Sequence, residues 1–140
     1  MTTKLVKDWM TSNTITVSSN SALPDAYRLM LDNKLRRVPV MDSETLVGIV
    51  TLGDLRRGDP PVGFDLDVFK TVDKLSKMEV HQVMTRNVHI ISSAESLVDA
   101  AHLMLKHSVR VLPVLDEENL VGVISRSDIL RAFIVFEGED

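Results

Sequence analysis

Two short stretches place a hydroxyl and a carboxylate at the same spacing. Thr51 precedes Asp54 by three residues, and Ser125 precedes Asp128 by the same interval. This spacing is a common signature of a helix start, because each side chain can bond a backbone N–H group of the first turn. A helix start also favours an anionic ligand, and an ionised Asp accepts hydrogen bonds from two hydroxyl groups such as a ribose diol. The spacing by itself favours capping over ligand binding and excludes neither.

Arginines accompany both stretches. Arg36 and Arg37 precede the apolar segment before the first stretch, Arg110 precedes the corresponding segment of the second, and Arg126 lies within the second stretch. Solvated surface charge is the usual role of arginine. A guanidinium group also offers forked donors that match phosphate oxygens. In a protein of net charge −4, basic residues kept beside both stretches fit an anionic ligand.

The two stretches belong to an internal duplication. Shifting the sequence by 74 positions (128 − 54) aligns Val6–Arg57 with Val80–Arg131 without a gap, and about 22 of the 52 aligned pairs are identical. Arg36 then corresponds to Arg110, whereas Arg37 corresponds to Val111. The chain therefore contains two copies of one unit, and their sites are expected to be related but unequal.

Each copy has the pattern strand, helix, strand, strand, helix, which predicts an α/β fold of the α+β type. In the first copy, short β-branched segments indicate strands and the apolar spacing of residues 22–34 indicates a helix. Pro24 fits the first turn of that helix, where its missing N–H group costs nothing. The predicted units are residues 1–57 and 80–140, joined by a linker, 58–79, in which Leu66–Lys77 is predicted to form a short helix. The predicted strands are 14–17, 37–42 and 46–51 in the first copy and 88–91, 110–116 and 120–125 in the second; the other predicted helices begin at residues 52, 96 and 126.

Composition excludes several classes of protein. The chain has 140 residues and no cysteine, which excludes disulfides and cysteine-bound metals. No apolar run approaches the ~20 residues that span a bilayer, and the N-terminus lacks the apolar core of a secretory signal. The acidic net charge argues against a nucleic-acid binder. We therefore expect a cytoplasmic protein that does not bind membranes or nucleic acid.

Neither metal chemistry nor catalysis is predicted. His102 and His107 are five positions apart, so on a helix they point to different sides, unlike a metal-binding pair at i and i+4. No hydroxyl residue has a convincing His–Asp partnership, and the sequence contains no P-loop or dinucleotide-binding glycine pattern. No catalytic residue, metal site or resident cofactor is expected.

The repeated motifs resemble a known family. Each copy carries Val-x-x-x-Met-Thr, then an arginine followed by Pro-Val, and then Leu-Val-Gly running into a hydroxyl residue and an aspartate. In this order they resemble a CBS-domain pair, also called a Bateman module, and are similar to the stand-alone CBS proteins of the acetoin-utilisation type. The resemblance implies two units packed through their sheets about a pseudo-two-fold axis, with two equivalent clefts where the units meet.

The resemblance also implies ligands and roles for residues. Family members commonly bind AMP, ADP, ATP or S-adenosylmethionine in these clefts, and magnesium is expected only together with a polyphosphate. Asp54 and Asp128 match the aspartate that holds the ribose in the family, beside Thr51 and Ser125, and the arginines match positions close to phosphate. For the adenine, the resemblance implies an apolar face made by Thr14, Leu35 and Ile49 in the first site and by Val88, Val109 and Val123 in the second. Core packing is an equally good interpretation of Ile49 and Val123.

We therefore expect a non-enzymatic regulatory module that senses adenine nucleotides, forms a homodimer and reports to a regulated protein on a separate chain. The alternative is a structural or adaptor protein whose clefts remain empty.

Overall fold

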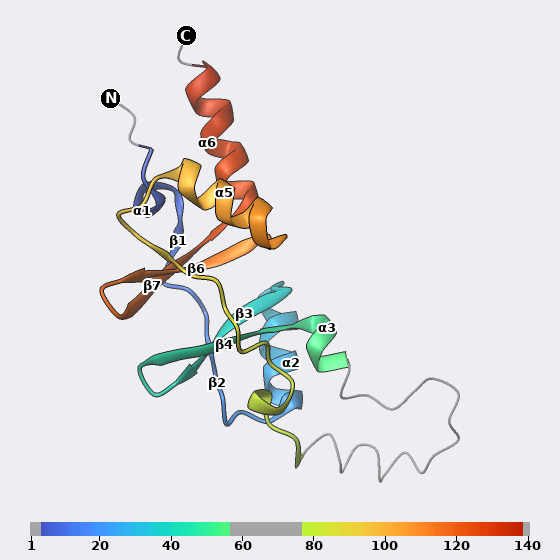
Figure 1. Ribbon diagram of the computed structural model, residues 1–140. Coiled ribbons are helices and arrows are strands. Elements are labelled where there is room, and N and C mark those ends of the chain that lie inside the picture. The colour runs from blue at the N-terminus through green and yellow to red at the C-terminus, as the bar shows by residue number, and fades with distance from the viewer. Residues whose placement is uncertain (1–3, 57–76, 139–140) are drawn as a thin grey trace. The chain divides into compact units, whose positions relative to one another are not determined.

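The computed structural model describes residues 4–56 and 77–138 (Figure 1). The chain forms two compact units, each with its own sheet and helices. The central unit comprises Ile15–Val88, and the C-terminal unit comprises His89–Asp140 together with the N-terminal segment Met1–Thr14. The fold is therefore a mixed α/β fold of the α+β type, as the sequence predicted. The compact units do not coincide with the two sequence copies, because the N-terminal segment of the first copy belongs to the C-terminal unit.

The central unit contains a three-stranded sheet in the order β2-β3-β4. Strand β2 runs parallel to β3, and β3 and β4 form an antiparallel hairpin. Its elements are β2 (Val17–Ser18), α2 (Leu23–Asp32), β3 (Arg37–Asp42), β4 (Thr45–Thr51), α3 (Leu52–Arg56) and the short 3₁₀ helix η1 (Val80–Gln82).

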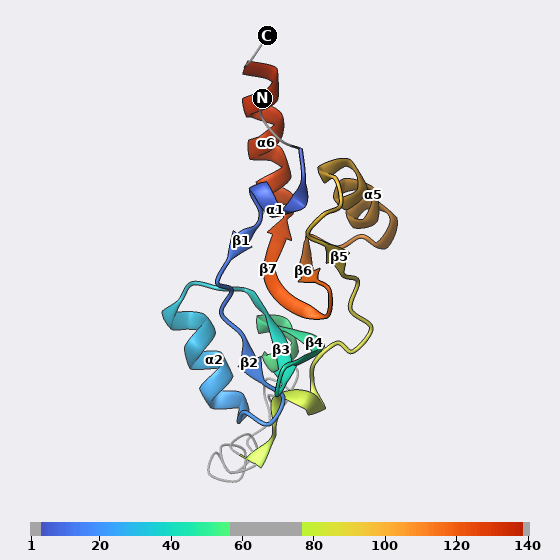
Figure 2. The same ribbon diagram turned by 90° about the vertical axis from the view of Figure 1, so that its left-hand side faces the viewer.

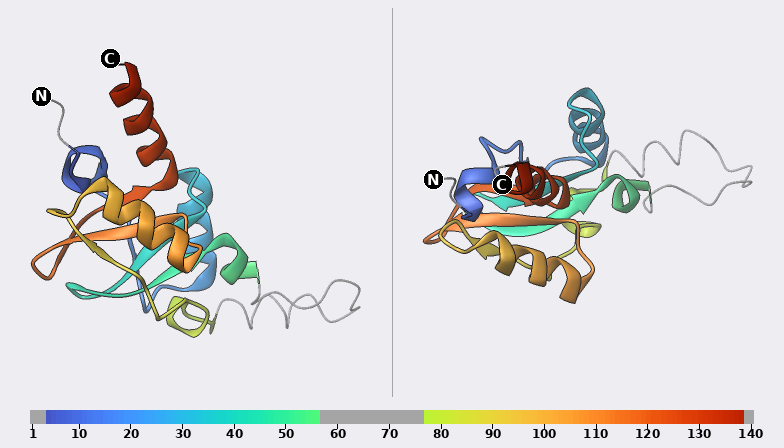
Figure 3. Two further views of the ribbon diagram at one scale, coloured as in Figure 1. Left: turned by 45° about the horizontal axis from the view of Figure 1, so that its top comes forward. Right: turned by 90° about the horizontal axis from the view of Figure 1, so that it is seen from above.

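The C-terminal unit repeats this plan around a four-stranded sheet in the order β1-β7-β6-β5. Figure 2 shows α6 continuing from the end of β7 with α1 beside it, and Figure 3 shows α5 running alongside the strands of this unit. Its elements are α1 (Val6–Trp9), β1 (Thr11–Ser12), β5 (Ile91–Ser92), α5 (Leu97–His107), β6 (Val111–Asp116), β7 (Asn119–Ser125) and α6 (Arg126–Gly138).

The two hairpins are built alike, down to their irregularities. The ladder shifts register after Val40 in the first hairpin and after Val114 in the second, which are equivalent positions of the duplication. The connecting turns each use a left-handed residue, Ser43 with φ 55° and Glu117 with φ 58°. Because the geometry recurs residue for residue, the strand ends that precede α3 and α6 are positioned in the same way.

The helices start where the sequence places their signals. Pro24 lies in the first turn of α2, as predicted, and the Ser96 side chain caps α5 by accepting from the Asp99 N–H group at 3.0 Å. Each of these helices buries one apolar stripe against the sheet of its unit. The buried residues of the stripes are Leu23, Ala26 and Met30 in α2, and Leu97, Ala100 and Met104 in α5.

The buried residues form two clusters, one in each unit. Val6 lies in the cluster of the C-terminal unit, and Val80, its counterpart in the duplication, lies in that of the central unit. Both side chains are completely buried. The short segments around them are therefore structural parts of units whose main hairpins lie elsewhere in the sequence.

The repeated Met-Thr and Leu-Val-Gly motifs contact each other crosswise. Thr11 of the first copy pairs with Val123 of the second, and Thr85 of the second copy bridges to Ile49 of the first. A Cβ atom at Gly122 would overlap the Thr11 carbonyl oxygen, and one at Gly48 would come within 2.7 Å of the Thr85 carbonyl oxygen. Glycine is required at both positions because a neighbouring backbone passes directly over them.

Some predicted elements differ in extent. Strand β2 begins at Val17, at the end of the predicted strand 14–17, and β5 begins at Ile91, at the end of 88–91. Helix α1 and strand β1 were not predicted, and most of the predicted helix Leu66–Lys77 lies outside the described residues. In residues 4–56 and 77–138, no helix has both the length and the apolar composition that crossing a membrane requires.

Candidate strand-to-helix ligand sites

The two candidate sites begin as reciprocal helix caps. In the central unit, the Thr51 N–H group donates to Asp54 Oδ2, and the Asp54 N–H group donates to Thr51 Oγ1, both at 3.0 Å. In the C-terminal unit, the Ser125 N–H group donates to Asp128 Oδ2 at 2.8 Å, and the Asp128 N–H group donates to Ser125 Oγ at 3.2 Å. The capping interpretation of both stretches is confirmed, and it leaves the predicted ribose contacts as a prediction.

Both aspartates are buried. Asp54 is 3% exposed and Asp128 is 2% exposed, and they are the only charged side chains in this class among the described residues. Arg131, one turn further along α6, donates from Nη2 to Asp128 Oδ1. Both oxygens of Asp128 therefore already have donors, and an approaching ribose hydroxyl group has to share Oδ1 with Arg131 or displace it. Sequence reasoning did not assign Arg131 to the site, although its i+3 spacing from Asp128 is a recognised signal of an ion pair.

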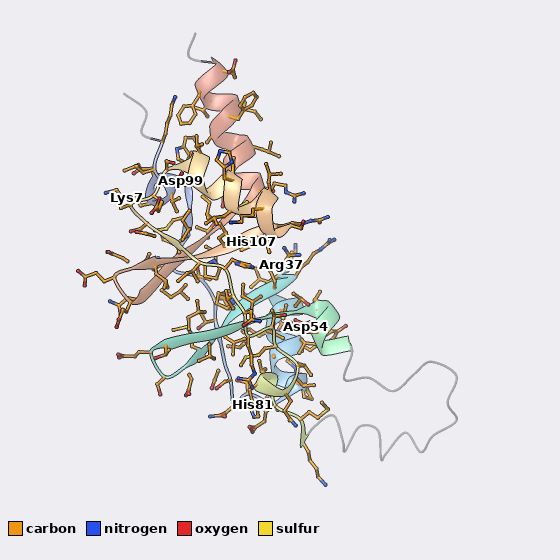
Figure 4. All side chains as sticks on the ribbon, viewed as in Figure 1. Lys7, Arg37, Asp54, His81, Asp99 and His107 are labelled. Atoms are coloured by element: carbon orange, nitrogen blue, oxygen red, sulfur yellow. The ribbon has the colours of Figure 1, made fainter. Side chains whose placement is uncertain are left out.

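The hairpins bring the predicted arginines to the same strand-to-helix junctions. Arg37 stands opposite Thr51 in the β3–β4 ladder, and the Leu52 N–H group donates to the Arg36 carbonyl oxygen at 2.9 Å. Figure 4 shows Arg37 on β3 and Asp54 in the first turn of α3. In the central unit, basic and acidic residues predicted from the sequence therefore meet at one end of the hairpin.

The C-terminal unit repeats this arrangement with a different set of charges. The Arg126 N–H group donates to the Arg110 carbonyl oxygen at 2.9 Å, and Val111 stands opposite Ser125. Val111 thus occupies the ladder position that Arg37 holds in the central unit, while Arg126 replaces Leu52. The residues that surround the two caps therefore differ in charge, and unequal ligand binding stays a prediction.

Thr14 and Val88, two of the residues predicted to face adenine, lie at the boundaries of the compact units. Thr14 belongs to the C-terminal unit, where its hydroxyl group donates to the Thr11 carbonyl oxygen at 3.2 Å, and Val88 belongs to the central unit. The prediction that groups Thr14 with Ile49 and Val88 with Val123 concerns contacts with a ligand, and it stays a prediction.

The remaining apolar positions are half-buried. Leu35 packs against the core cluster of the central unit and Val109 against that of the C-terminal unit, so core packing accounts for part of each side chain's surface. Ile49 and Val123 stand opposite Pro39 and Pro113 in the two ladders.

The C-terminal unit also carries a histidine pair that sequence reasoning missed. The rings of His89 and His107 stack with centroids 3.6 Å apart and an interplanar angle of 12°. The pKa of His107 is lowered, first by loss of hydration and then by the charges of His89 and Lys106. The duplication gave no signal, since the counterparts of the pair are Ile15 and Asn33. A metal held in the plane of one ring would lie outside the plane of a parallel ring, so the stack does not form a two-histidine metal site.

Two carboxyl groups interact at the start of α5. A hydrogen bond between the Glu95 and Asp99 side chains raises the pKa of Glu95 and lowers that of Asp99. No group of three or more His, Asp or Glu side chains in the described parts of the chain is arranged to hold a metal ion.

Comparison with known proteins identifies the family. The model of the CBS domain matches residues 6–59 and 80–135, which together cover both copies of the duplication. The chain belongs to the CBS-domain family. It contains a CBS-domain pair, as the repeated motifs predicted, and the two matches follow the sequence copies rather than the compact units.

Similar CBS proteins match nearly the whole chain. The CBS domain-containing protein YhcV of Bacillus subtilis is 32% identical over 124 residues, covering 89% of this chain and 81% of YhcV. The crystal structure of CBSX2, a CBS-pair protein of Arabidopsis thaliana, in complex with AMP has a TM-score of 0.78 and 31% identity, covering 95% and 98% of the two chains. A putative acetoin utilization protein (AcuB) of Vibrio cholerae has a TM-score of 0.79 and 28% identity, covering 98% and 95%.

Proposed function

We propose that this CBS-domain pair is a non-enzymatic regulatory module that binds an adenosine-containing ligand at its two strand-to-helix junctions. The candidate ligands are AMP, ADP, ATP and S-adenosylmethionine, and magnesium accompanies only the polyphosphates. The observation that carries the proposal is the pair of buried aspartates, Asp54 and Asp128, each at the start of a helix with arginines alongside. The AMP complex of CBSX2 supports the choice of ligand class.

We assign each part of a nucleotide to predicted site residues of the two units. Asp54 and Asp128 are acceptors for ribose hydroxyl groups, because an ionised carboxylate only accepts hydrogen bonds. Phosphate is assigned to Arg36 and Arg37 in the central unit and to Arg110 and Arg126 in the C-terminal unit, whose guanidinium groups form charge-assisted hydrogen bonds. The apolar residues Leu35, Ile49, Val109 and Val123, with Thr14 and Val88, are assigned to the adenine.

Regulation follows from differential affinity. A ligand shifts an equilibrium between two conformations or assembly states only if it binds one of them more tightly. The proposed output is therefore a change of conformation or of self-association, transmitted to a regulated protein on a separate chain.

Isothermal titration of the full chain with AMP, ADP, ATP and S-adenosylmethionine tests the proposal. A ligand at about 100-fold its Kd stabilises the folded state by about 2.7 kcal/mol, which also raises the Tm. Absence of both binding heat and a thermal shift with all four ligands contradicts nucleotide sensing and favours the adaptor alternative.

The substitutions Asp54→Asn and Asp128→Asn separate ribose binding from capping. Asparagine keeps a side-chain oxygen that can accept the capping hydrogen bond, but it loses the negative charge. Each variant is expected to weaken one site by about tenfold or more and to retain a cooperative thermal transition. Asp25→Asn, at an exposed first-turn carboxylate of α2, is the matched control and leaves binding unchanged. Full affinity at both sites in the double variant Asp54→Asn/Asp128→Asn contradicts the ribose assignment.

A further inference from the structure

Two methionines at equivalent positions of the duplication fill the space above two strand glycines. Met84 Sδ lies 2.8 Å from the position that a Cβ atom would take at Gly48, and Met10 Sδ lies 3.0 Å from the corresponding position at Gly122. Positions 10 and 84, like positions 48 and 122, are related by the shift of 74 residues. The same contact between sulfur and backbone therefore occurs once in each compact unit.

Both sulfur atoms lie beside the crosswise backbone pairing. In the central unit, the Ile49 N–H group donates to the Thr85 carbonyl oxygen at 3.0 Å, and the Thr85 N–H group donates to the Ile49 carbonyl oxygen at 2.8 Å. In the C-terminal unit, Thr11 stands opposite Val123, and Figure 2 shows β1 beside β7. In each pair the threonine directly follows one of the two methionines, and its partner directly follows one of the two glycines. A chemical change at either sulfur atom therefore acts next to a backbone pairing.

The two methionines are more accessible than those of the cores. Met10 and Met84 are half-buried, and each packs against the core cluster of its unit. Met30 is 0% exposed and Met104 is 3% exposed. Since oxidation of a sulfur-containing side chain follows its exposure, Met10 and Met84 are expected to react while the core methionines stay protected.

The chemistry is a two-electron oxidation by a peroxide. The chain has no cysteine, so methionine sulfur is its main target for this class of oxidant. The thioether sulfur attacks one oxygen of hydrogen peroxide, a sulfur–oxygen bond forms and the oxygen–oxygen bond breaks. The proton on the transferred oxygen moves to the departing hydroxide, which leaves as water. Sulfur is oxidised to a sulfoxide, and the peroxide is reduced.

We propose that Met10 and Met84 are paired oxidation sites, at which conversion to methionine sulfoxide weakens the pairing of each Met-Thr segment with its neighbouring hairpin. The added oxygen needs room at a sulfur that already lies against a strand backbone, so the contact has to open. A sulfoxide is also polar, and it replaces an apolar atom that packs against the core. At Gly48 the Thr85 carbonyl oxygen shares the same space, 2.7 Å from the Cβ position, and repels a second oxygen.

The strands that are affected lead to the two caps. Strand β4 ends at Thr51 and β7 ends at Ser125, the first residues of the reciprocal caps. Sulfoxide reductases return methionine sulfoxide to methionine, so the modification is reversible. The two methionines therefore expose the strands that carry the candidate sites to redox control. This inference goes beyond the proposed function and requires no bound ligand.

Peroxide treatment of the ligand-free full chain tests the two sites. Peptide mass spectrometry identifies a dose that oxidises Met10 and Met84 and leaves Met30 and Met104 intact. At this dose the Tm is expected to fall by about 3 °C or more, the loss typical of an overpacked contact in a chain of this size.

The double variant Met10→Leu/Met84→Leu identifies the atoms responsible. Leucine is close to methionine in volume and has no sulfur to oxidise, so this variant is expected to keep most of its Tm after the same treatment. Met41→Leu is the matched control, because Met41 is also half-buried but belongs to β3 and not to a Met-Thr segment. The control shows the same decrease in Tm on peroxide treatment as the wild type.

Amide hydrogen exchange locates the effect of each site. Met10→Leu leaves Met84 as the site that oxidation can change, so exchange is expected to accelerate at Ile49 and Thr85. Met84→Leu leaves Met10, and the faster exchange is then expected in β1 and in the residues of β7 that face it. The two variants are each other's control, because the substitution and the treatment are the same.

The inference is overturned by oxidation of Met10 and Met84 only after the core methionines, by an equal decrease in Tm in the double leucine variant, or by unchanged exchange at Ile49 and Thr85 once Met84 is oxidised. Recovery of the Tm after treatment with both stereospecific sulfoxide reductases supports it. A decrease in Tm that persists after complete reduction assigns the loss to other chemistry and also overturns the inference. Because every measurement uses the ligand-free chain, the outcome does not depend on nucleotide binding, and failure of the nucleotide titration leaves it intact.

Discussion

At the residue scale, Asp128 is held between two donors that act on different oxygens. Ser125 contributes its backbone N–H group to Oδ2, and Arg131 contributes its guanidinium group to Oδ1. If Asp128 binds a ribose, Arg131 competes with the ligand for one oxygen. Arg131, which stabilises the junction through this ion pair, then lowers the affinity of the junction for the ligand.

Arg131→Gln is therefore expected to have opposite effects on stability and on binding. The free energy of unfolding falls by about 1 kcal/mol, a small value because the Arg131 side chain is 60% exposed and its ion pair is screened by solvent. Binding of adenosine, chosen because it has no phosphate to sense the lost positive charge, tightens several-fold. Chemical denaturation and titration measure the two effects, and Arg28→Gln on α2 is the control. Weaker adenosine binding contradicts the competition.

The backbone crossing at Gly122 gives a second prediction at this scale. A methyl group there meets the Thr11 carbonyl oxygen, which is fixed by the pairing of β1 with β7, so Gly122→Ala forces the two strands apart. We expect a loss of about 1–3 kcal/mol in the free energy of unfolding. At Gly53, in α3, the nearest atom to an added Cβ is Thr51 Oγ1 at 3.5 Å, an ordinary contact. Gly53→Ala is therefore the control, and it is expected to be neutral or slightly stabilising in a denaturant titration.

At the scale of elements, local patterns predicted what local chemistry determines. The apolar stripe and Pro24 predicted α2, and the spacing of Thr51 and Asp54 predicted the cap of α3, because these features act within a few residues of the chain. Strand β1 was not predicted because it has only two residues and forms by pairing with β7, which is distant in the sequence. The spacing of Asp128 and Arg131 was available in the sequence and was overlooked, whereas nothing in the sequence indicates that His89 reaches His107.

The His89–His107 stack makes the C-terminal unit sensitive to pH. The lowered pKa of His107 means that the unfolded chain, with a value near 6.5, binds a proton more readily than the folded chain. The contribution of neutral His107 to the stability of the folded state is therefore complete above about pH 6.5. It is lost as the pH falls through that value towards the lower pKa that His107 has in the folded state. The pKa of Glu95 is raised and that of Asp99 is lowered, so these two shifts change stability in opposite directions.

His107→Asn, which installs the residue found at the equivalent position 33, is expected to reduce the decrease in Tm between pH 7.5 and pH 5.5. Calorimetry at the two pH values measures the difference. His102→Asn removes a histidine from the same helix without touching the stacked pair and serves as the control. An equal decrease in Tm in wild type and His107→Asn contradicts the assignment of this pH dependence to the stack.

At the scale of the whole molecule, the duplication predicted two units and their internal order but not their composition. Sequence copies are defined by alignment, whereas compact units are defined by which surfaces bury each other. Val6 and the Met10-Thr11 segment precede the first copy's strand, yet they complete the core and sheet of the C-terminal unit. Nothing in the first copy's own pattern distinguishes this arrangement from one in which each copy completes itself, because the two Met-Thr segments are nearly identical.

The placement of Val6 in the C-terminal unit and of Val80 in the central unit predicts where the effects of two equivalent substitutions will be found. Val6→Ala and Val80→Ala delete the same methyl groups from completely buried side chains at equivalent positions, and each is expected to cost about 1–3 kcal/mol. If these two segments are placed in this way in solution, Val6→Ala accelerates amide hydrogen exchange in β6 and β7, more than 100 residues away along the chain. Strands β3 and β4 then keep more of their protection. Val80→Ala has the reverse pattern, although Val80 is the first aligned residue of the second copy. The two variants are each other's control, since they differ in location and not in chemistry. Faster amide hydrogen exchange in β3 and β4 on substitution of Val6 contradicts this placement, because each copy then completes its own unit.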